Sequence, residues 1–366
     1  MQHEWNNLLN ECNSASVFLT WEWLFSWWQT FKGGHQLFII SVRDTNGTLA
    51  GIGPKKKKKR YGCFRILSII GGDSSVASDY LDILVNRNAE SEIRRLILNY
   101  MINQRRNWNV LVFPNLISAS PTYLALKQIS EENNLVYSEQ SCGICPVLHL
   151  PERYEDFISS LGSRTRRNIR NYDRRLKNNH QVEFITEHRN PDMVHTLLRL
   201  HQKRRDKLNA YTTFQHQEYI QFLNEIVSCF QNIGLNKFYA FRQNQHIVAL
   251  FYFFEFQEEL YLYQGGFDNS ELPPNISLMH TLFNSCVRDA IDRNIRIVHL
   301  LEGDSGFKRT FTQDKIITKR VVIGNRLDHQ LYVNTMFLKF KIRNTLKRMM
   351  PEFAWQQIKR NLKRID

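Results

Sequence analysis

The chain has no run of about 20 apolar residues, the length that a membrane-spanning helix needs. Its first residues, Met1-Gln-His-Glu, lack the basic start and apolar middle of a secretory signal. The six cysteines are scattered and suggest no disulfide framework, and Cys142-Gly-Ile-Cys145 has no second pair to complete a four-ligand metal site. These absences predict a cytoplasmic protein without a membrane span and without a metal.

Acidic residues are in deficit. The 366 residues include 49 Lys and Arg against 35 Asp and Glu, which gives a formal charge of +14. An excess of this size favours partners that carry negative charge, namely nucleic acid, an anionic membrane surface or phosphate-bearing substrates.

The densest basic stretch is Lys55–Arg60, with five lysines and one arginine in succession. Because six like charges repel one another, we expect an exposed loop here. This loop would contact nucleic acid or anionic lipid, or it would simply be solvated.

Aromatic residues are plentiful, with 24 Phe, 14 Tyr and 7 Trp, so the chain can form real cores and its length predicts two domains. Residues Thr20–Phe31 predict a helix capped by Thr20, with Trp21, Leu24, Trp27 and Trp28 at helical spacing. This face either packs in a core or stacks on bases or sugars.

Both halves of the chain repeat one order of elements: helices, a three-stranded meander, a helix, a strand, a second helical element and a final strand or strands. In the second half this order comprises Lys237–Arg242, Ile247–Phe256, Leu260–Phe267, a helix over Ile276–Asn294 and a buried strand over Arg296–Leu300. We therefore predict an α/β fold with a mixed sheet covered by helices on both faces, in domains spanning 1–150 and 151–325.

The remaining residues, 326–366, predict a basic amphipathic helical tail. Such a helix either lies on a membrane surface or docks on the body of the protein with its basic residues outward.

A second basic segment, Ser163–Lys177, predicts a helix whose apolar face is Ile169, Tyr172 and Leu176. The guanidinium group binds two oxygens of a phosphate or carboxylate at once, so the arginines indicate anion binding. A charged, solvated helix is the alternative. The basic residues are Arg164, Arg166, Arg167, Arg170, Arg174, Arg175 and Lys177.

The loop after the predicted strand Arg296–Leu300 carries Glu302, Asp304 and Lys308, together with two glycines. Ligands of open α/β sheets bind outside the carboxyl ends of strands. The carboxylates can accept a proton or hold an amine, and the lysine can hold an anion. Alternatively, Asp304 caps a helix and Lys308 forms a surface ion pair.

The repeated order of elements resembles the GNAT acyltransferase fold present twice, and specific motifs resemble the CelD-type acetyltransferases of bacterial cellulose and exopolysaccharide production, relatives of the Fem-type peptidyl transferases. The resemblance covers about residues 15–325. The motifs are Trp21-Glu22-Trp23 with Trp27-Trp28, Ser78-Asp79-Tyr80-Leu81-Asp82, Leu150-Pro151, Leu161-Gly-Ser-Arg164 with Arg166-Arg167-Asn168, His201, Gly265-Gly-Phe267-Asp268, and Glu302-Gly303-Asp304 with Phe307-Lys308.

This resemblance implies transfer of an acetyl or longer acyl group from acyl-CoA, such as acetyl-CoA, or from an acyl-carrier protein. The acceptor would be an amine or hydroxyl of a sugar, a polysaccharide precursor or a glycolipid. The donor would lie where Leu260–Phe267 diverges from Arg296–Leu300, against Gln264 and Gly265, with its pyrophosphate near Asn275, Ile276 and Ser277. The family's phosphate loop is glycine-rich, whereas this chain has Leu272-Pro273-Pro274-Asn275, which leaves room for another donor.

Direct attack needs a base near the acceptor and a proton for the leaving group. The resemblance implies Asp304 or Glu302 as base or acceptor-orienting group, and Tyr263 as the acid that protonates the leaving thiolate. The expected substrate-binding residues are Lys308, Arg166, Arg167, His201 and Asp268. The first half has Pro114-Asn115-Leu116 in place of the Glu-Gly-Asp motif, so we predict that it is not catalytic.

Two other functions fit the same sequence. One is Fem-like aminoacyl transfer from charged tRNA, which the positive charge suits. The other is a non-catalytic protein that binds nucleic acid or a membrane through Lys55–Arg60 and the tail. In either case the protein would lie in the cytoplasm or peripherally on the inner face of the membrane.

Overall fold

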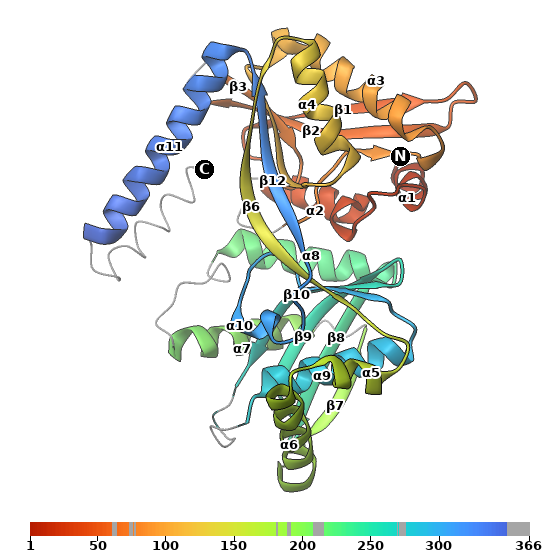
Figure 1. The fold of residues 1–366 in the computed structure, drawn as a ribbon, viewed down its shortest axis with the longest axis vertical. Helices are drawn as coiled ribbons and strands as arrows, with labels where there is room; N and C mark the ends of the chain where they lie inside the picture. Colours follow the sequence, from red (N-terminus) through yellow and green to blue (C-terminus); the bar gives the residue numbers. More distant parts are fainter. Residues whose placement is uncertain are drawn as a thin grey trace. The chain divides into compact units, whose positions relative to one another are not determined.

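The structure is a computed structural model that describes residues 1–60, 64–72, 76, 78–180, 182–188, 192–207, 216–268, 270 and 276–349. The chain divides into two compact units, one formed by Met1–Gly143 with Ile317–Asp366 and the other by Ile144–Ile316. Both units are mixed α/β structures, as predicted, and Figure 1 shows their elements. None of the helices in the described part of the chain combines the length and apolar character needed to cross a bilayer.

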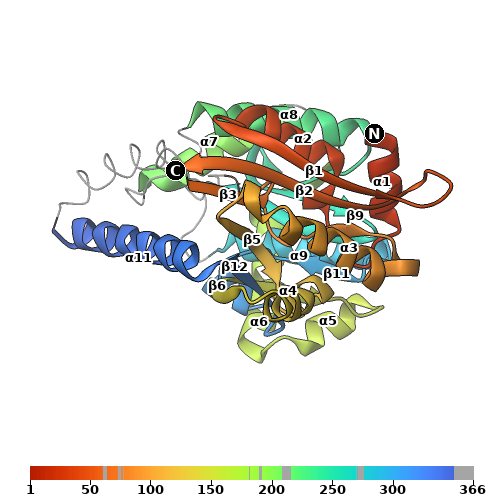
Figure 2. The same ribbon diagram turned by 90° about the horizontal axis from the view of Figure 1, so that it is seen from above.

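The first unit contains a mixed sheet with helices on both faces. The hairpin of β1 (His35–Arg43) and β2 (Leu49–Arg60) continues through β3 (Phe64–Ile69) to β5 (Val110–Ile117), which runs parallel to β3, and β4 (Leu84–Val85) pairs with β2. The helices α1 (Gln2–Asn10) and α2 (Trp21–Phe31) lie on one side of the hairpin, and α3 (Glu90–Asn103) and α4 (Pro121–Glu132) lie on the other (Figure 2).

The tryptophan-rich segment forms the predicted helix α2. The Thr20 hydroxyl accepts a hydrogen bond from the Trp23 N–H, which is the expected N-cap. Trp23 and Trp27 are fully buried, and the Trp23 indole donates to the Ser78 hydroxyl at 2.9 Å. Within the predicted face, Leu24 and Trp27 are buried in the core, whereas Trp21 and Trp28 are half-buried.

The prediction of an exposed loop at Lys55–Arg60 is wrong, because these residues form the second half of β2. The strand pairs with β1 on one side and β3 on the other. Lys55 and Lys56 are buried, so neither faces a polyanion. The Lys55 ammonium lies 3.1 Å from the Phe113 ring centroid, and that of Lys56 lies over the Trp27 ring and donates to the Gly72 carbonyl. The two amino groups alternate across the strand, and each lies against an aromatic ring.

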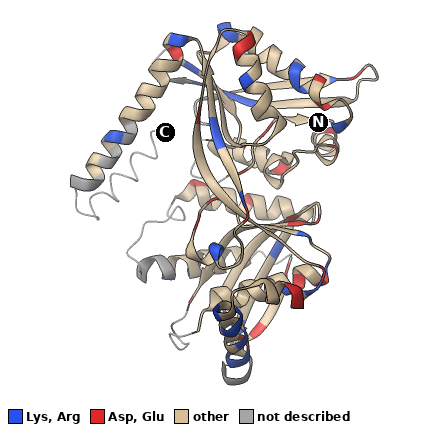
Figure 3. Cartoon of the chain, viewed as in Figure 1, with Lys and Arg blue, Asp and Glu red and all other residues tan. Residues whose placement is uncertain are grey.

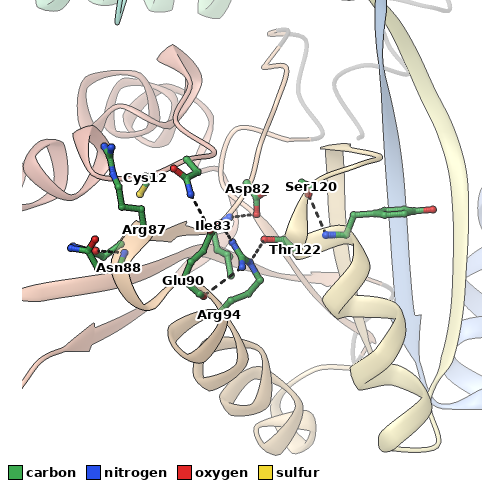
Figure 4. A network of polar contacts seen from close by, with 12 residues as sticks. Cys12, Asp82, Ile83, Arg87, Asn88, Glu90, Arg94, Ser120 and Thr122 are labelled. Atoms are coloured by element: carbon green, nitrogen blue, oxygen red, sulfur yellow. Dashed lines mark hydrogen bonds and ion pairs between the residues drawn. The ribbon is translucent and has the colours of Figure 1, made fainter.

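A polar network surrounds Asp82 (Figure 4), a carboxylate that also interacts electrostatically with Lys55. The Arg94 guanidinium donates to the Thr122 hydroxyl at 3.1 Å and pairs with Glu90. Burial raises the pKa of Asp82 to about 6, although the Thr122 and Ser120 hydroxyls and the Ile83 N–H stabilise its charged form. The Ser78–Asp82 motif is thus a structural element of the first unit.

Replacing Lys55 with Met should stabilise the first unit and flatten its pH dependence. Burial lowers the Lys55 pKa well below 10.5, and its amine has no hydrogen-bond partner among the described residues. The unfolded chain therefore binds a proton that the folded chain does not, so stability rises with pH until about 10.5. We expect a gain of about 1–4 kcal/mol near neutral pH in denaturant unfolding. Half-buried Lys57→Met is the control, and an unchanged pH slope in Lys55→Met would contradict the assignment.

The second unit repeats the arrangement. The strands β7 (Glu183–Glu187), β8 (Asn236–Gln243), β9 (His246–Phe256) and β10 (Glu259–Phe267) form an antiparallel meander, followed by the parallel strand β11 (Ile297–His299). The helices α5 (Tyr154–Ser160), α6 (Ser163–His180) and α9 (Leu278–Asp292) pack together on one face. On the other face, α7 (Asp192–Lys207) packs on β9 and β10, and α8 (Gln217–Asn232) packs on β8. The meander and α9 were predicted, but β7 was not.

Two strands pass from one unit to the other. β6 (Val136–His149) begins in the first unit and ends antiparallel to β11, and β12 (Lys315–Gly324) ends antiparallel to β5 (Figure 1). The sequence pattern predicts two strands, Leu135–Ser141 and Val147–Leu150, where the structure has the single strand β6. It also predicts a strand over Ile316–Ile323 without indicating that β5 is its partner. The chain continues from β12 into α11 (Arg326–Met349), the predicted tail helix, in the first unit.

Candidate functional site

The parallel strands β10 and β11 part after three residue pairs. They pair from Glu259 with Ile297 to Tyr261 with His299. Beyond this point the chain after β11 follows β6, because the Leu300 N–H bonds to the Pro146 carbonyl and the Gly303 N–H bonds to the Ile144 carbonyl. β10 instead stays paired with β9 as far as Phe267. The predicted divergence of the two strands is therefore confirmed.

A β-bulge in β10 lies at the point of divergence. The register with β9 shifts between Leu262 and Gln264, so Tyr263 is the extra residue. The Asp268 N–H bonds to the Val248 carbonyl of β9. Since N–H groups alternate sides along a strand, those of Gly265 and Phe267 point away from β9, toward the side that β11 has left. These two N–H groups therefore lie on the edge of β10 that β11 no longer pairs with.

Tyr263 belongs to a hydrogen-bonded chain of side chains. The Gln264 amide donates to the Tyr219 hydroxyl at 3.2 Å, and the Tyr219 hydroxyl donates to that of Tyr263, also at 3.2 Å. Burial raises the pKa of Tyr219 to about 12, although its bonds with Tyr263 and Gln264 oppose this. Tyr219 therefore stays a neutral phenol at physiological pH. In its hydrogen bond with Tyr219, the Tyr263 hydroxyl is the acceptor. The bond therefore does not use the hydroxyl proton of Tyr263.

The end of β10 lies directly against α7. A Cβ atom on Gly266 would stand 2.8 Å from the Leu200 Cβ and 2.9 Å from the His201 backbone nitrogen, so only glycine permits this approach. His201 is buried here. The next turn of α7 supplies Lys203, whose ammonium bonds to the Asp268 carboxylate at 2.8 Å. Partial burial raises the pKa of Asp268, but the bonds from Lys203 and Ser270 outweigh it and hold the pKa far below its usual value.

The N-terminus of α9 meets the same region through aromatic contacts. The Ser277 hydroxyl caps the helix and lies 2.6 Å from the His280 Nδ1. The His280 ring lies 5.3 Å from that of Phe307 in α10 (Gly306–Arg309), and Phe307 lies 6.1 Å from Phe251, which packs beneath Gly265. Burial lowers the pKa of His280, which favours a neutral imidazole. Ser277 and buried Ile276 thus lie in one aromatic cluster with β10, and Asn275 is outside the described residues.

The loop after β11 presents Glu302 and Asp304 to solvent. The Asp304 carboxylate pairs with Arg309 at 2.9 Å, while Ser305, not Asp304, caps α10. The Lys308 ammonium donates to the Leu301 and Glu302 carbonyls, both at 2.8 Å, across a turn in which Leu301 has a φ of 59°. These bonds use two of the three ammonium donors, so Lys308 fixes the loop that carries the carboxylates.

The arginines of α6 form a separate surface. Arg164, Arg167, Arg170 and Arg174 are exposed at helical spacing, and Figure 3 shows the basic residues along this helix. Arg166 is half-buried and donates to the Ser159 carbonyl at 3.3 Å. No recorded contact among the described residues brings Arg166 or Arg167 to β10. As predicted, Ile169 and Leu176 hold the helix on the core.

Sequence reasoning missed Tyr219, Lys203 and His280 as site residues. The tyrosine and the lysine lie on predicted helices without a motif, so only tertiary contact reveals them. His280 had a local signal, because it stands one turn after the capping residue Ser277. Within the described residues, no three His, Cys, Asp or Glu side chains gather as metal ligands would.

Comparison with known proteins bears on this geometry. Residues 163–309 match the family model described as "Acetyltransferase (GNAT) domain". The matched segment contains the bulge, the point of divergence and the Glu302–Lys308 loop. No protein with a curated description matches the sequence.

Solved structures resemble the chain over most of its length. A structure described as FemX has a TM-score of 0.64 at 9% identity and covers 91% of this chain and 97% of its own. A conserved protein of unknown function from Bacteroides thetaiotaomicron has a TM-score of 0.54 at 11% identity, and the match covers 89% of this chain and 98% of that protein. The C-terminal domain of a putative lysylphosphatidylglycerol synthetase from Agrobacterium fabrum has a TM-score of 0.52 at 10% identity, and the match covers 91% of this chain and 93% of that domain. At these identities the likeness shows a shared fold. The CelD-type resemblance stays a prediction.

Proposed function

We propose that the second unit is a GNAT-type acyltransferase that moves an acyl group from a thioester to an amine or hydroxyl. The observation that carries this proposal is the divergence of β10 and β11 next to the bulge at Tyr263, within the segment that matches the GNAT domain. The backbone N–H groups of Gly265 and Phe267 would hold the amide and carbonyl oxygens of the donor. The start of α9 favours negative charge, such as the donor's phosphates.

The residues of the site suggest a direct transfer. The acceptor nitrogen or oxygen attacks the thioester carbonyl carbon while Glu302 or Asp304 takes its proton. The resulting oxyanion receives hydrogen bonds from the backbone of β10. As the carbon–sulfur bond breaks, Tyr263 gives its proton to the leaving thiolate, and Tyr219 and Gln264 hold its hydroxyl in place.

The acceptor we propose is a sugar, a polysaccharide precursor or a glycolipid. His201, Lys203 and Asp268 lie together where β10 meets α7, and they offer charged and polar groups to a polyhydroxylated molecule. Lys308 would act by fixing the turn that carries Glu302 and Asp304.

A second candidate is aminoacyl transfer from charged tRNA. Two observations favour it: the exposed arginine row on α6 and the similarity of the fold to FemX. The absence of glycines from Leu272 to Asn275 favours a donor other than coenzyme A. In this case Arg164, Arg166 and Arg167 would contact phosphates of the nucleic acid.

The donor class can be tested by ligand-dependent stabilisation. A saturating ligand at a hundredfold excess over its dissociation constant should stabilise the folded protein by about 2.7 kcal/mol. We expect this for acetyl-CoA, a longer acyl-CoA or an acyl-carrier protein, together with thiol release when a sugar amine is added. Stabilisation by aminoacyl-tRNA alone would favour the second candidate, and no response to any donor would contradict both.

A further inference from the structure

The helix α11 has two faces, and only one of them packs on the first unit. On that face the His329 imidazole lies 2.7 Å from the Ser138 hydroxyl. Tyr332 and Met336 pack against a cluster that contains Ile66, Val110, Val112 and Val322. These contacts hold the N-terminal half of the helix on β5 and its neighbours, so α11 is a fixed element of this unit.

The opposite face of α11 is a row of exposed apolar side chains. Leu327, Leu331, Leu338 and Ile342 are exposed by 80%, 55%, 57% and 50%. Their spacing of four, seven and four residues aligns them along one side of the helix, about half a turn from Tyr332 and Met336. Phe337 and Val333 are also exposed, but they lie about a third of a turn or more from this row, on another side of the helix. A contiguous exposed apolar surface of this kind marks an interaction site.

The charge of α11 is positive apart from Asp328 in its first turn. From His329 to Met350 the sequence contains five Lys and Arg and no Asp or Glu. Exposed Lys341 adjoins the apolar row, with its ammonium 5.0 Å from the Phe337 ring centroid. Leucines beside basic residues, with Asp328 as the one acidic residue of the helix, match a membrane surface, whose lipid headgroups are negative and whose interior is apolar.

Other occupants fit this face less well. A coiled coil with a second copy of the chain would use Leu331 and Leu338 as seam positions. The intervening seam positions would be Thr335 and Ile342 in one register or Asn334 and Lys341 in the other, so either seam contains a polar residue. The basic residues of both copies would also repel one another. Nucleic acid would satisfy the charges but would leave the leucines in water.

We propose that α11 is an interfacial helix that seats the protein on an anionic phospholipid surface. Its apolar row enters the boundary between headgroups and acyl chains, and its basic side chains bind lipid phosphates. Each basic residue near such a surface strengthens binding by about fivefold, and buried apolar side chains add to this. The inference stands independently of the proposed reaction, because it concerns a helix of the other unit.

Vesicle co-sedimentation tests the proposal with the full-length protein. We expect binding to vesicles of phosphatidylcholine with one quarter phosphatidylglycerol, and little binding to pure phosphatidylcholine. Raising the salt from 0.1 to 1 M, which shortens the screening length from about 10 to 3 Å, should weaken binding. The double variant Leu331→Gln/Leu338→Gln should bind at least about tenfold more weakly.

The matched control is Leu124→Gln, which changes a leucine on α4 of the same unit that is 62% exposed. This variant should bind vesicles within about twofold of the parent, since an isolated exposed leucine carries no such role. All these side chains are exposed, so thermal unfolding should be unchanged. The proposal is overturned if the parent protein does not bind anionic vesicles or if the double variant binds them as well as the parent. A change in oligomeric state in the double variant would also overturn it.

Discussion

Replacing Tyr263 with Phe should lower kcat by about 10²–10⁴-fold while leaving the fold intact. The substitution removes one hydroxyl that accepts from Tyr219, and the ring keeps its packing against Phe254, whose centroid is 4.8 Å away. Loss of a general acid in the transition state produces an effect of this size. Because the hydroxyl would act on the leaving group rather than in ground-state binding, KM should change little. Steady-state thiol release measures both constants.

The control is Tyr239→Phe. Tyr239 is also a buried phenol of this sheet, but its hydroxyl donates to Asp289 at 2.6 Å on the α9 side. Removing this bond should cost about 0.5–3 kcal/mol of stability and leave kcat within about twofold. If Tyr263→Phe retains full turnover, Tyr263 is not the acid. A donor with a better leaving group should also rescue Tyr263→Phe, which a loss of positioning alone would not explain.

Replacing Gly266 with Ala should destabilise the second unit by about 1–3 kcal/mol or more. The added methyl would meet backbone atoms of α7, which cannot rotate away as a side chain does. Either α7 or the end of β10 must move, and both carry the Asp268–Lys203 pair. We therefore expect loss of activity together with a lower midpoint of denaturant unfolding.

Gly162→Ala is the matched control, because a Cβ at Gly162 meets no atom within 4 Å. This change should alter the free energy of unfolding by no more than about 0.5 kcal/mol. Equal effects of the two substitutions would show that the approach of α7 to β10 is looser than the structure shows.

Local pattern predicted the frame of the candidate site. Alternating apolar residues marked the meander, and the short β-branched run marked β11. The divergence of the two strands was implied by the resemblance to the GNAT fold. The bulge could not be predicted in this way, because the alternating aromatics of β10 continue through Tyr263. The role of Lys308 was also hidden, since its partners are backbone carbonyls that carry no sequence signal.

The largest error came from treating charge as a local property. Lys55 and Lys56 lie in a strand because Phe113, Trp27 and the Gly72 carbonyl receive them, and these groups come from distant parts of the chain. Strand partners posed the same difficulty. The pattern predicts a strand over Ile316–Ile323, but it does not show that this strand, β12, pairs with β5 of the first unit. The assignments of Glu302, Asp304 and the α6 arginines stay predictions.

The passage of β6 and β12 between the units constrains how the protein can be made. The first unit needs β12 beside β5, so its sheet is incomplete until Gly324 has left the ribosome. At about 5–20 residues per second, the segment between Gly143 and Gly324 takes on the order of 10–35 seconds to synthesise. During that interval the edge of β5 that pairs with β12 has no strand partner. A chaperone that binds exposed sheet edges of nascent chains should therefore improve the yield of this protein.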